Sequence, residues 1–300
     1  MRRRAPRAIA VTRTLLRRFR LPKPDETGSK DERGQVLVVG GSSQVAGAVR
    51  LAGEAALRAG AGKLQLATVQ SSASALGMAV PESLVVALPE SRRGEIVGAR
   101  SSAMLARYVK QVDAMLVGPG MTGDRAAHAL LAPCIGRLGA DAALILDAAA
   151  ILALRSDEAL LAPLDGRAVL TPHAGEMASL LGVEKDAVEA EPDEMALHAA
   201  ARFGAVVVLK GAESSIATPD GKLYRYAGGN VGLATSGSGD TLAGIVAGLA
   251  ARGAPPLHAV VWAVYLHGSA GRALAKRIGP IGFLARELLA ELPALLRRLG

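Results

Sequence analysis

Two hydrophobic patterns alternate along most of the chain. Short apolar, β-branched runs predict strands at residues 36–39, 64–68, 84–88, 114–117, 144–147, 168–171 and 206–210. Longer Ala- and Leu-rich stretches predict helices between them, at residues 49–59, 101–110, 125–138, 176–181 and 193–203. This alternation is typical of repeated βα units around a mostly parallel sheet. Because the strands are continuously apolar, we expect helices to cover both faces of the sheet.

The last third of the chain departs from this pattern. Residues 215–218 and 223–226 flank a Pro-Asp-Gly-Lys turn and predict a β-hairpin. Further helical patterns follow and end the chain at residues 257–276 and 284–299. We therefore expect one α/β domain of three layers over residues 34–300.

Charge is unevenly distributed. The 300 residues are 50% hydrophobic and 21% charged, which is typical of a globular domain, and their formal net charge is +8. Residues 1–30 contain ten basic and two acidic residues, so the remaining chain is neutral, with 25 of each. A neutral body with only 3% aromatic residues argues against a nucleic-acid partner. We expect residues 1–33 to be a basic, flexible extension.

Other sequence features point to a cytoplasmic protein. The basic segment has neither the serine richness of a transit peptide nor the apolar core of a secretory signal. No apolar run is long enough to span a membrane, so we expect no membrane partner. Cys134 is the single cysteine; it cannot form an intramolecular disulfide and is interpreted as a small packing residue.

The loop at residues 232–241, GLATSGSGDT, is the most informative local sequence. Small residues lead directly into a helix whose apolar positions include Leu242, Ile245 and Leu249. The free amides of a helix N-terminus bind anions, and glycines allow a ligand to approach the backbone. Asp240 is placed there as a candidate base; the alternative is an N-cap aspartate on a buried helix.

Other small-residue loops also follow predicted strands. They include Gly40 and Gly41, the segment 118–120, the segment 171–176, and Gly211. Ligands bind beyond the carboxyl ends of strands in such sheets, so these loops predict one site. The first loop lacks dinucleotide-fingerprint spacing, and a simple strand-to-helix turn remains the alternative. Lys210 ends a strand, from where its ammonium could contact a phosphate; an exposed lysine is the alternative.

Three further residues are candidates for the site. His173 and Glu176 are too few for a zinc site, so we predict substrate contact by His173 and a helix-start or structural role for Glu176. Asp147 at a strand end is either a carboxylate of the ligand loops or a cap for the next helix. The sequence does not separate these two interpretations.

These motifs together resemble the ADP-dependent NAD(P)H-hydrate dehydratases of the ribokinase-like superfamily. The resemblance covers roughly residues 30–293 and rests on an ordered set of segments: Lys30 and Gly34, 40–42, 47–48, 56–62, 118–121, 171–176, 209–212, 229–230 and 233–240. The Gly-Ser-Gly-Asp sequence alone indicates only the superfamily. The Thr-Pro-His and Asn-to-Ala-Thr loops favour the dehydratases.

The resemblance implies a three-layer ribokinase-like fold and a hydro-lyase that repairs hydrated nicotinamide cofactors. The S-form of hydrated NADH or NADPH would be dehydrated while ADP is converted to AMP and phosphate, with ATP as the other candidate nucleotide. Asp240 would be the base that frees the hydroxyl of the hydrate for attack on phosphorus. The residues implied to contact the hydrate are Ala48, Gly120, His173 and Asp240. The adenine nucleotide would be held by Lys210, Gly211, Ala212, Glu213, Ser214, Gly237, Ser238 and Gly239.

The resemblance also implies Mg²⁺ on the phosphates, a homotetramer, and a separate epimerase in the same pathway, because no epimerase domain is present. The residues that would bind the metal are unknown. Val45 stands where relatives often have Tyr, and Ala149 replaces the second acid of a common Asp-Ala-Asp pattern.

Two other functions remain open from the sequence. One is a kinase of the same superfamily that acts on a sugar or a vitamin-precursor alcohol. The other is a regulatory nucleotide-binding protein without catalysis, although an intact Asp240 disfavours it.

Overall fold

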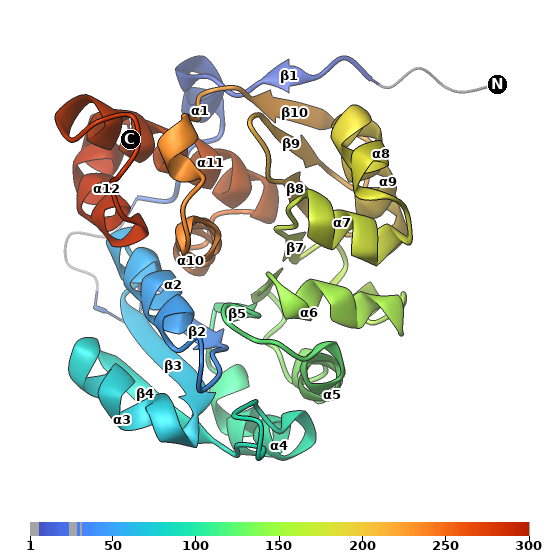
Figure 1. Cartoon of the computed structure of the whole chain (residues 1–300), viewed down its shortest axis with the longest axis vertical. Coiled ribbons are helices and arrows are strands. Elements are labelled where there is room, and N and C mark those ends of the chain that lie inside the picture. Colours follow the sequence, from blue (N-terminus) through green and yellow to red (C-terminus); the bar gives the residue numbers. More distant parts are fainter. Residues whose placement is uncertain (1–5, 24–28, 31, 300) are drawn as a thin grey trace.

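A computed structural model describes residues 6–23, 29–30 and 32–299; among these, ten strands form one sheet between two layers of helices (Figure 1). The strands are β1 (Ile9–Ala10), β2 (Gln35–Val39), β3 (Lys63–Val69), β4 (Ser83–Leu88), β5 (Ala114–Val117), β6 (Ala143–Leu146), β7 (Ala168–Leu170), β8 (Val206–Leu209), β9 (Ser214–Ala217) and β10 (Leu223–Tyr226). The predicted strands and the predicted hairpin are thus confirmed.

The strand order is β1-β10-β9-β8-β7-β6-β5-β2-β3-β4. Strands β2 to β8 pair with one another in parallel, whereas β9 runs antiparallel to both β8 and β10. The chain builds β3 and β4 on one side of β2 and then crosses to β5 on the other side. The loops that follow β2 and β5 therefore flank the point where the strand order reverses, which is where ligands bind in open α/β sheets.

Successive strand residues pack into two hydrophobic clusters, so both faces of the sheet are buried. Val36 and Val38 belong to one cluster, and Leu37 and Val39 to the other. The first cluster is covered by α1 (Arg13–Arg18), α2 (Gly47–Arg58), α10 (Ser238–Ala251), α11 (Pro256–Arg277) and α12 (Ala285–Leu299), with α3 (Gln70–Ala79) beside β4. The second is covered by α4 (Gly98–Val109), α5 (Asp124–Ile135), α6 (Ala149–Leu152), α7 (Ala174–Leu181), α8 (Lys185–Ala190) and α9 (Pro192–Phe203). The predicted arrangement of helices on both faces is confirmed (Figure 1).

Helices α2 and α10 touch through their backbones. A Cβ added to Gly244 would lie 2.1 Å from the carbonyl oxygen of Ala52, and one added to Gly248 would lie 2.4 Å from that of Ala56. Only glycine fits at such distances. Helix α10, which carries Asp240, therefore packs directly against helix α2, which carries Ala48.

The basic N-terminal segment is folded where the structure describes it. Strand β1 pairs in parallel with β10, Leu15 and Leu16 are buried in the first cluster, and the indole of Trp262 donates a hydrogen bond to the carbonyl of Phe19. The expectation of a flexible extension is therefore wrong for residues 6–23, because Leu15 and Leu16 are buried in the first cluster and Phe19 stacks on His258 of α11. Residues 1–5 and 24–28 lie outside the described part, and the domain boundary near residue 34 stays a prediction.

Cys134 on α5 is fully buried, and burial raises the pKa of its thiol to about 11, in keeping with a packing role.

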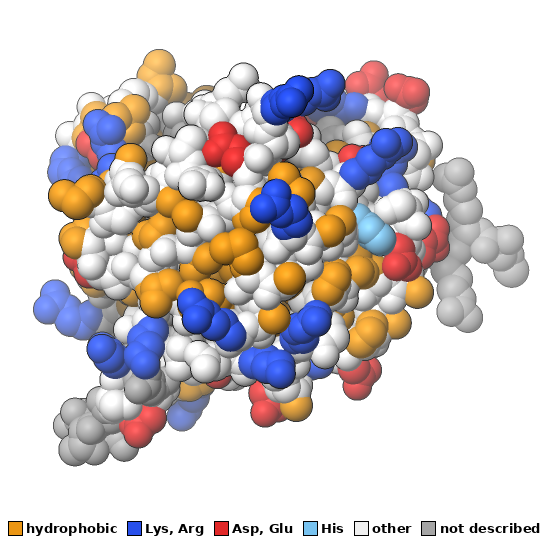
Figure 2. All heavy atoms as spheres, turned by 90° about the horizontal axis from the view of Figure 1, so that it is seen from below, with side chains coloured by type: hydrophobic (Ala, Val, Ile, Leu, Met, Phe, Trp, Pro, Cys, Tyr) orange, Lys and Arg blue, Asp and Glu red, His pale blue; other side chains and the backbone are white. Residues whose placement is uncertain are grey.

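On the face seen in Figure 2, basic side chains are spread among acidic and hydrophobic ones instead of forming one continuous patch. Within the described ranges, no helix is both long and apolar enough to cross a membrane.

Candidate active site

Two glycine-containing loops meet at the switch point of the sheet. The amide of Gly41 donates a hydrogen bond to the carbonyl of Pro119 over 2.7 Å. Gly120 has φ +69°, and a Cβ there would lie 2.4 Å from the carbonyl oxygen of Val45 and 3.0 Å from the Cβ of Ala48. A side chain at this position would be strained and would displace its neighbours. The fold thus brings the predicted substrate residues Ala48 and Gly120 together on a surface made largely of backbone.

A buried charged network occupies the ends of the next strands. Lys210 follows β8, and its ammonium donates a hydrogen bond to Asp147 Oδ1 over 2.9 Å and lies 3.8 Å from Glu176 Oε2. The hydroxyl of Thr171 donates to the same Asp147 oxygen over 2.6 Å. Burial lowers the pKa of Lys210, but the attraction of Asp147, Glu176 and Asp240 outweighs it and holds that pKa above its usual value. Lys210 is therefore a charged, partly buried residue and not a solvated one.

Asp147 belongs to this network and does not cap the next helix. The N-cap of α6 is Ala148, and it makes no side-chain capping hydrogen bond. Ala148 has φ 48° and ψ −128°, a conformation that costs a non-glycine residue about 1–3 kcal/mol. A Cβ on the neighbouring Gly118 would lie 1.7 Å from the Asp147 carbonyl oxygen. Close packing therefore fixes the strained turn that presents the Asp147 carboxylate to Lys210.

Helix α10 begins at the third part of the site. Its N-cap is Gly237, with φ +84°, where a Cβ would lie 2.4 Å from Leu51 Cδ1. Asp240 is thus in the first turn of α10, so its interpretation as an N-cap is wrong. Burial raises the pKa of Asp240 to about 6; the charges of Asp147 and Glu176 act in the same direction and the charge of Lys210 opposes them. Such a carboxylate accepts a proton more readily than an exposed aspartate does.

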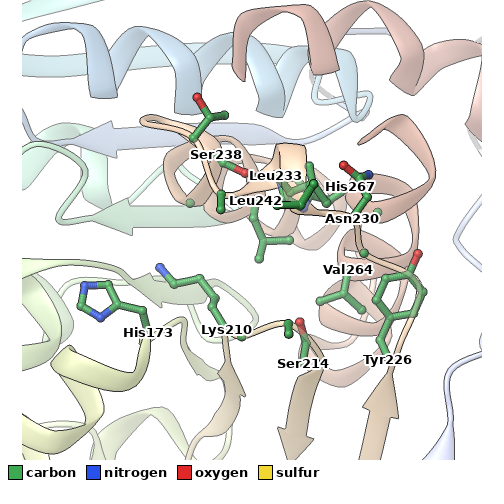
Figure 3. A pocket seen from close by; sticks show the side chains of 18 residues that line it. His173, Lys210, Ser214, Tyr226, Asn230, Leu233, Ser238, Leu242, Val264 and His267 are labelled. Carbon is green, nitrogen blue, oxygen red and sulfur yellow. Dashed lines mark hydrogen bonds between the residues drawn. The ribbon is translucent and has the colours of Figure 1, made fainter. Parts of the chain in front are cut away.

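A cavity of about 800 Å³ lies between Lys210, the start of α10 and helix α11 (Figure 3). A Cβ on Gly239 would lie 3.2 Å from Lys210 Nζ, so the ammonium is close to the start of α10. The predicted nucleotide residues on the cavity wall are Lys210, Gly211, Ala212, Ser214, Ser238 and Gly239. Leu233, Leu242 and Val264 add an apolar wall, which suits a nucleobase or sugar.

Some predicted site residues lie elsewhere. Glu213 is exposed on the surface, with a carboxylate oxygen 3.8 Å from the guanidinium of Arg225. Gly237 shapes the start of α10 without lining the cavity. Among the described residues, Ala48, Gly120 and Asp240 also stand outside the cavity wall. Most of the predicted nucleotide residues therefore line the cavity together with His173, whereas the glycine loops with Ala48 and Gly120 lie outside its wall. The binding roles of all these residues stay predictions.

The Thr-Pro-His loop forms the start of α7. His173 Nδ1 accepts hydrogen bonds from the amides of Gly175 and Glu176, and the carboxylate of Glu176 accepts one from the His173 amide. This reciprocal capping box gives Glu176 the expected helix-start role. The imidazole of His173 is 58% exposed and lines the cavity beside Lys210 (Figure 3), where substrate contact stays a prediction.

The sequence analysis missed His267 and Tyr226, which also line the cavity. Tyr226 is fixed by Arg272, whose guanidinium donates to its hydroxyl over 2.9 Å. His267 Nε2 lies 3.0 Å from Ser238 Oγ. No local motif marks His267, because its partner is 29 residues away on another helix.

Comparison with known proteins identifies the family of this chain. The chain matches the NAD(P)H-hydrate dehydratase family over residues 36–294. The chain belongs to this family. An ADP-dependent (S)-NAD(P)H-hydrate dehydratase of Xanthomonas campestris pv. campestris is 51% identical over 294 residues, with 98% of each chain covered. Bifunctional NAD(P)H-hydrate repair enzymes are relatives as well, and the chain spans about half of their length.

Solved structures agree with this dehydratase assignment and with the ribokinase-like fold. A ribokinase-like superfamily protein of Enterococcus faecalis has a TM-score of 0.81 and 27% identity, covering 98% of this chain and 96% of its own. The ADP/ATP-dependent NAD(P)H-hydrate dehydratase of Bacillus subtilis, co-crystallised with ATP and Mg²⁺, has a TM-score of 0.79 and 28% identity, covering 99% of this chain and 100% of its own. The predicted fold class is confirmed.

The side chains that the structure describes do not form a metal site by themselves. In the described ranges, no group of three or more His, Cys, Asp or Glu residues is placed to hold a metal ion. Asp147 is hydrogen-bonded to Lys210, and Glu176 is engaged in the cap of α7. Any Mg²⁺ would therefore depend mainly on phosphate oxygens and water, as is common for nucleotide-bound Mg²⁺.

Proposed function

We propose that this chain dehydrates the S-form of hydrated NADH or NADPH back to NAD(P)H, while ADP is converted to AMP and phosphate. The observation that carries the proposal is the position of Asp240. This partly buried carboxylate lies in the first turn of α10, in the electrostatic field of Lys210, and α10 is packed against the helix of Ala48. The Asp240 carboxylate therefore lies where it can reach both a nucleotide phosphate at the start of α10 and a hydrate bound beside Ala48.

Asp240 acts as the base in this reaction. Its carboxylate takes the proton from the hydroxyl of the hydrate, whose oxygen attacks the β-phosphorus of ADP as the bond to AMP breaks. The phosphorylated hydrate then loses phosphate together with a proton from the adjacent ring carbon, and this elimination restores the double bond of NAD(P)H. The elements of the hydrate's water are thereby consumed in the cleavage of ADP to AMP and phosphate.

Charge stabilisation comes from two parts of the chain. Lys210 remains protonated and lies against the start of α10, so it can offset the charge that develops on phosphate oxygens. The first amides of the 14-residue helix α10 add the positive end of the helix dipole. Mg²⁺ would neutralise further phosphate charge when bound with the nucleotide.

We further propose that the protein works in the cytoplasm as a homotetramer, with a separate epimerase that supplies the S-form of the hydrate. The epimerase part of this proposal is supported by the names of the bifunctional relatives, which indicate that a second repair activity accompanies dehydration in those chains. The two epimers of a hydrate differ at one carbon, so an enzyme specific for one of them uses the whole pool only when they interconvert.

The test is an assay of the purified full chain with NADH hydrate, Mg²⁺ and either ADP or ATP. We expect NADH absorbance to return in step with phosphate release, and the faster nucleotide identifies the phosphoryl donor. The Asp240→Asn variant serves as the control for a base-dependent reaction. Accumulation of a stable phosphorylated product without released phosphate would favour the kinase; nucleotide binding without any reaction would favour the regulatory protein.

A further inference from the structure

A hydrogen bond joins helix α11 to the first residue of helix α10. His267 Nε2 lies 3.0 Å from the hydroxyl oxygen of Ser238, and Ser238 is only 6% exposed. Figure 3 shows both side chains on the cavity wall that α10 and α11 form. The predicted nucleotide cavity is thus bordered by an imidazole that the reaction itself does not use.

The imidazole acts in its neutral form. Burial, together with the nearby charge of Lys210, lowers the pKa of His267 to about 4, although a hydrogen bond to the backbone of Ser238 acts in the opposite direction. Above pH 5, His267 therefore brings no positive charge to a phosphate. Its contribution has to come from the hydrogen bond.

That hydrogen bond holds a helix start that has no ordinary cap. The N-cap residue of α10 is Gly237, which has no side chain to bind the free amides. Ser238 is followed directly by Gly239, next to Lys210 Nζ, and by Asp240. A rotation of this first turn would move a phosphate-binding amide and the base together.

We propose that His267 is a positioning residue: through the hydroxyl of Ser238 it holds the first turn of α10 in the orientation that binds the nucleotide phosphates. This inference rests on the proposed function, in which ADP occupies the adjoining cavity. The hydrogen-bond partner of His267 is Ser238 and not Asp240, so we expect the loss of His267 to show first in nucleotide binding.

The direct test is calorimetric titration of the full chain with ADP. We expect His267→Phe, which keeps a ring but loses the hydrogen bond, and Ser238→Ala each to weaken ADP binding about 5- to 20-fold. His267→Gln supplies an amide that can form the hydrogen bond to Ser238, so its Kd for ADP should stay within about threefold of the parent value. The double variant should bind ADP no more weakly than either single variant, because both changes remove the same interaction.

Steady-state kinetics separates positioning from a general loss of structure. The KM for ADP should rise in the same ratio as its Kd. The KM for the hydrate should stay the same, and so should the loss of activity at low pH that protonation of Asp240 causes. The matched control is His258→Phe. His258 lies on the same helix and stacks on Phe19 with ring centroids 4.2 Å apart, away from the cavity wall, so we expect unchanged ADP binding.

Each remaining outcome is decisive. Parent-like ADP binding by a folded His267→Phe variant, or additive losses in the double variant, would overturn the inference. If His267→Phe does not fold, parent-like binding by Ser238→Ala would overturn it instead. A parent protein that does not bind ADP at all would refute the proposed function before any variant is compared.

Discussion

The candidate site has two sides with different chemistry. On the charged side, four buried or half-buried ionisable groups come together from the ends of β6 and β8 and from the first turns of α7 and α10: Asp147, Lys210, Glu176 and Asp240. On the glycine side, the loops after β2 and β5 present backbone because their glycines have no room for a Cβ. The ionisable groups on the charged side are held partly away from water, which lowers stability. The shape of the glycine side is fixed by backbone contacts that also stabilise the fold.

The largest expected effect comes from removing the charge of Asp240. Asp240→Asn should lower turnover roughly 10²- to 10⁴-fold, because an amide cannot act as the base. The pKa of Asp240 is raised on folding from 3.8 to about 6, so the ionised group weakens folding above pH 6. The variant should therefore gain about 1–3 kcal/mol in the free energy of unfolding at pH 8.

Activity assays and urea unfolding at pH 8 measure both consequences. At pH 3, where the carboxyl group is protonated in both states, the gain in stability should vanish. An inactive variant that is also less stable would show that Asp240 contributes to the fold, and the contrast between the two sides would break down.

A second change tests the ion pair on the charged side. Lys210→Met leaves the Asp147 carboxylate buried without its cation, which should cost about 3–5 kcal/mol of stability. Urea midpoints measure this loss, and much of it should return in the double variant Lys210→Met with Asp147→Asn. The matched control is Lys222→Met, which removes an exposed ion pair with Asp220 and should leave the midpoint unchanged. Equal effects of the two lysine variants would contradict a buried network.

On the glycine side, Gly118→Ala should act through the fold. Gly118 has φ +125°, and a Cβ would meet the Asp147 carbonyl oxygen at 1.7 Å. We expect a loss of about 2–3 kcal/mol in thermal or urea unfolding, with the pH profile unchanged in the protein that remains folded. Gly136→Ala, where a Cβ meets no atom within 4 Å, is the control. Tolerance of Gly118→Ala would show that the glycine side is not fixed by shape.

The smallest expected effect is a pH dependence. Because Asp240 has to be ionised to act as a base and its pKa is about 6, kcat/KM should rise with pH up to about 6 and then level off. Below this pH the rate should fall about tenfold per pH unit. Gly118→Ala should keep the same limb, whereas an acid limb near pH 4 would mean that the group is not held in a buried, negatively charged environment.

The repeating apolar runs were sufficient to predict the sheet. The central strands β2, β3 and β5 to β8 are buried almost throughout, so their composition differs sharply from that of the helices around them. Helix α3, with the sequence QSSASALGMA, was missed because its small and polar residues give no comparable contrast. The folded N-terminal segment was missed because arginines dominate it, although Val11, Leu15, Leu16 and Phe19 repeat at nearly helical spacing.

The site was predictable where its residues follow strands. Lys210, His173 and the glycine loops stand next to recognisable strand ends, so a parallel sheet brings them to one edge. His267 and the pairing of Asp147 with Lys210 depend on how distant helices and strands pack, which local spacing does not encode. Glu213 does not line the cavity, because the chain enters an antiparallel strand after Gly211 and the Glu213 side chain is exposed, so its nucleotide role stays a prediction.

The backbone contact between α2 and α10 has a consequence for the flexibility of the site. Gly and Ala lose no side-chain conformational entropy on folding, and a contact made from them has no rotamers to exchange. The distance between the two helices is therefore set by atomic radii alone and should change little with temperature. Asp240 and the loop before α2 are thus carried on one rigid unit, so motions that admit or release a ligand have to come from the loops around this unit.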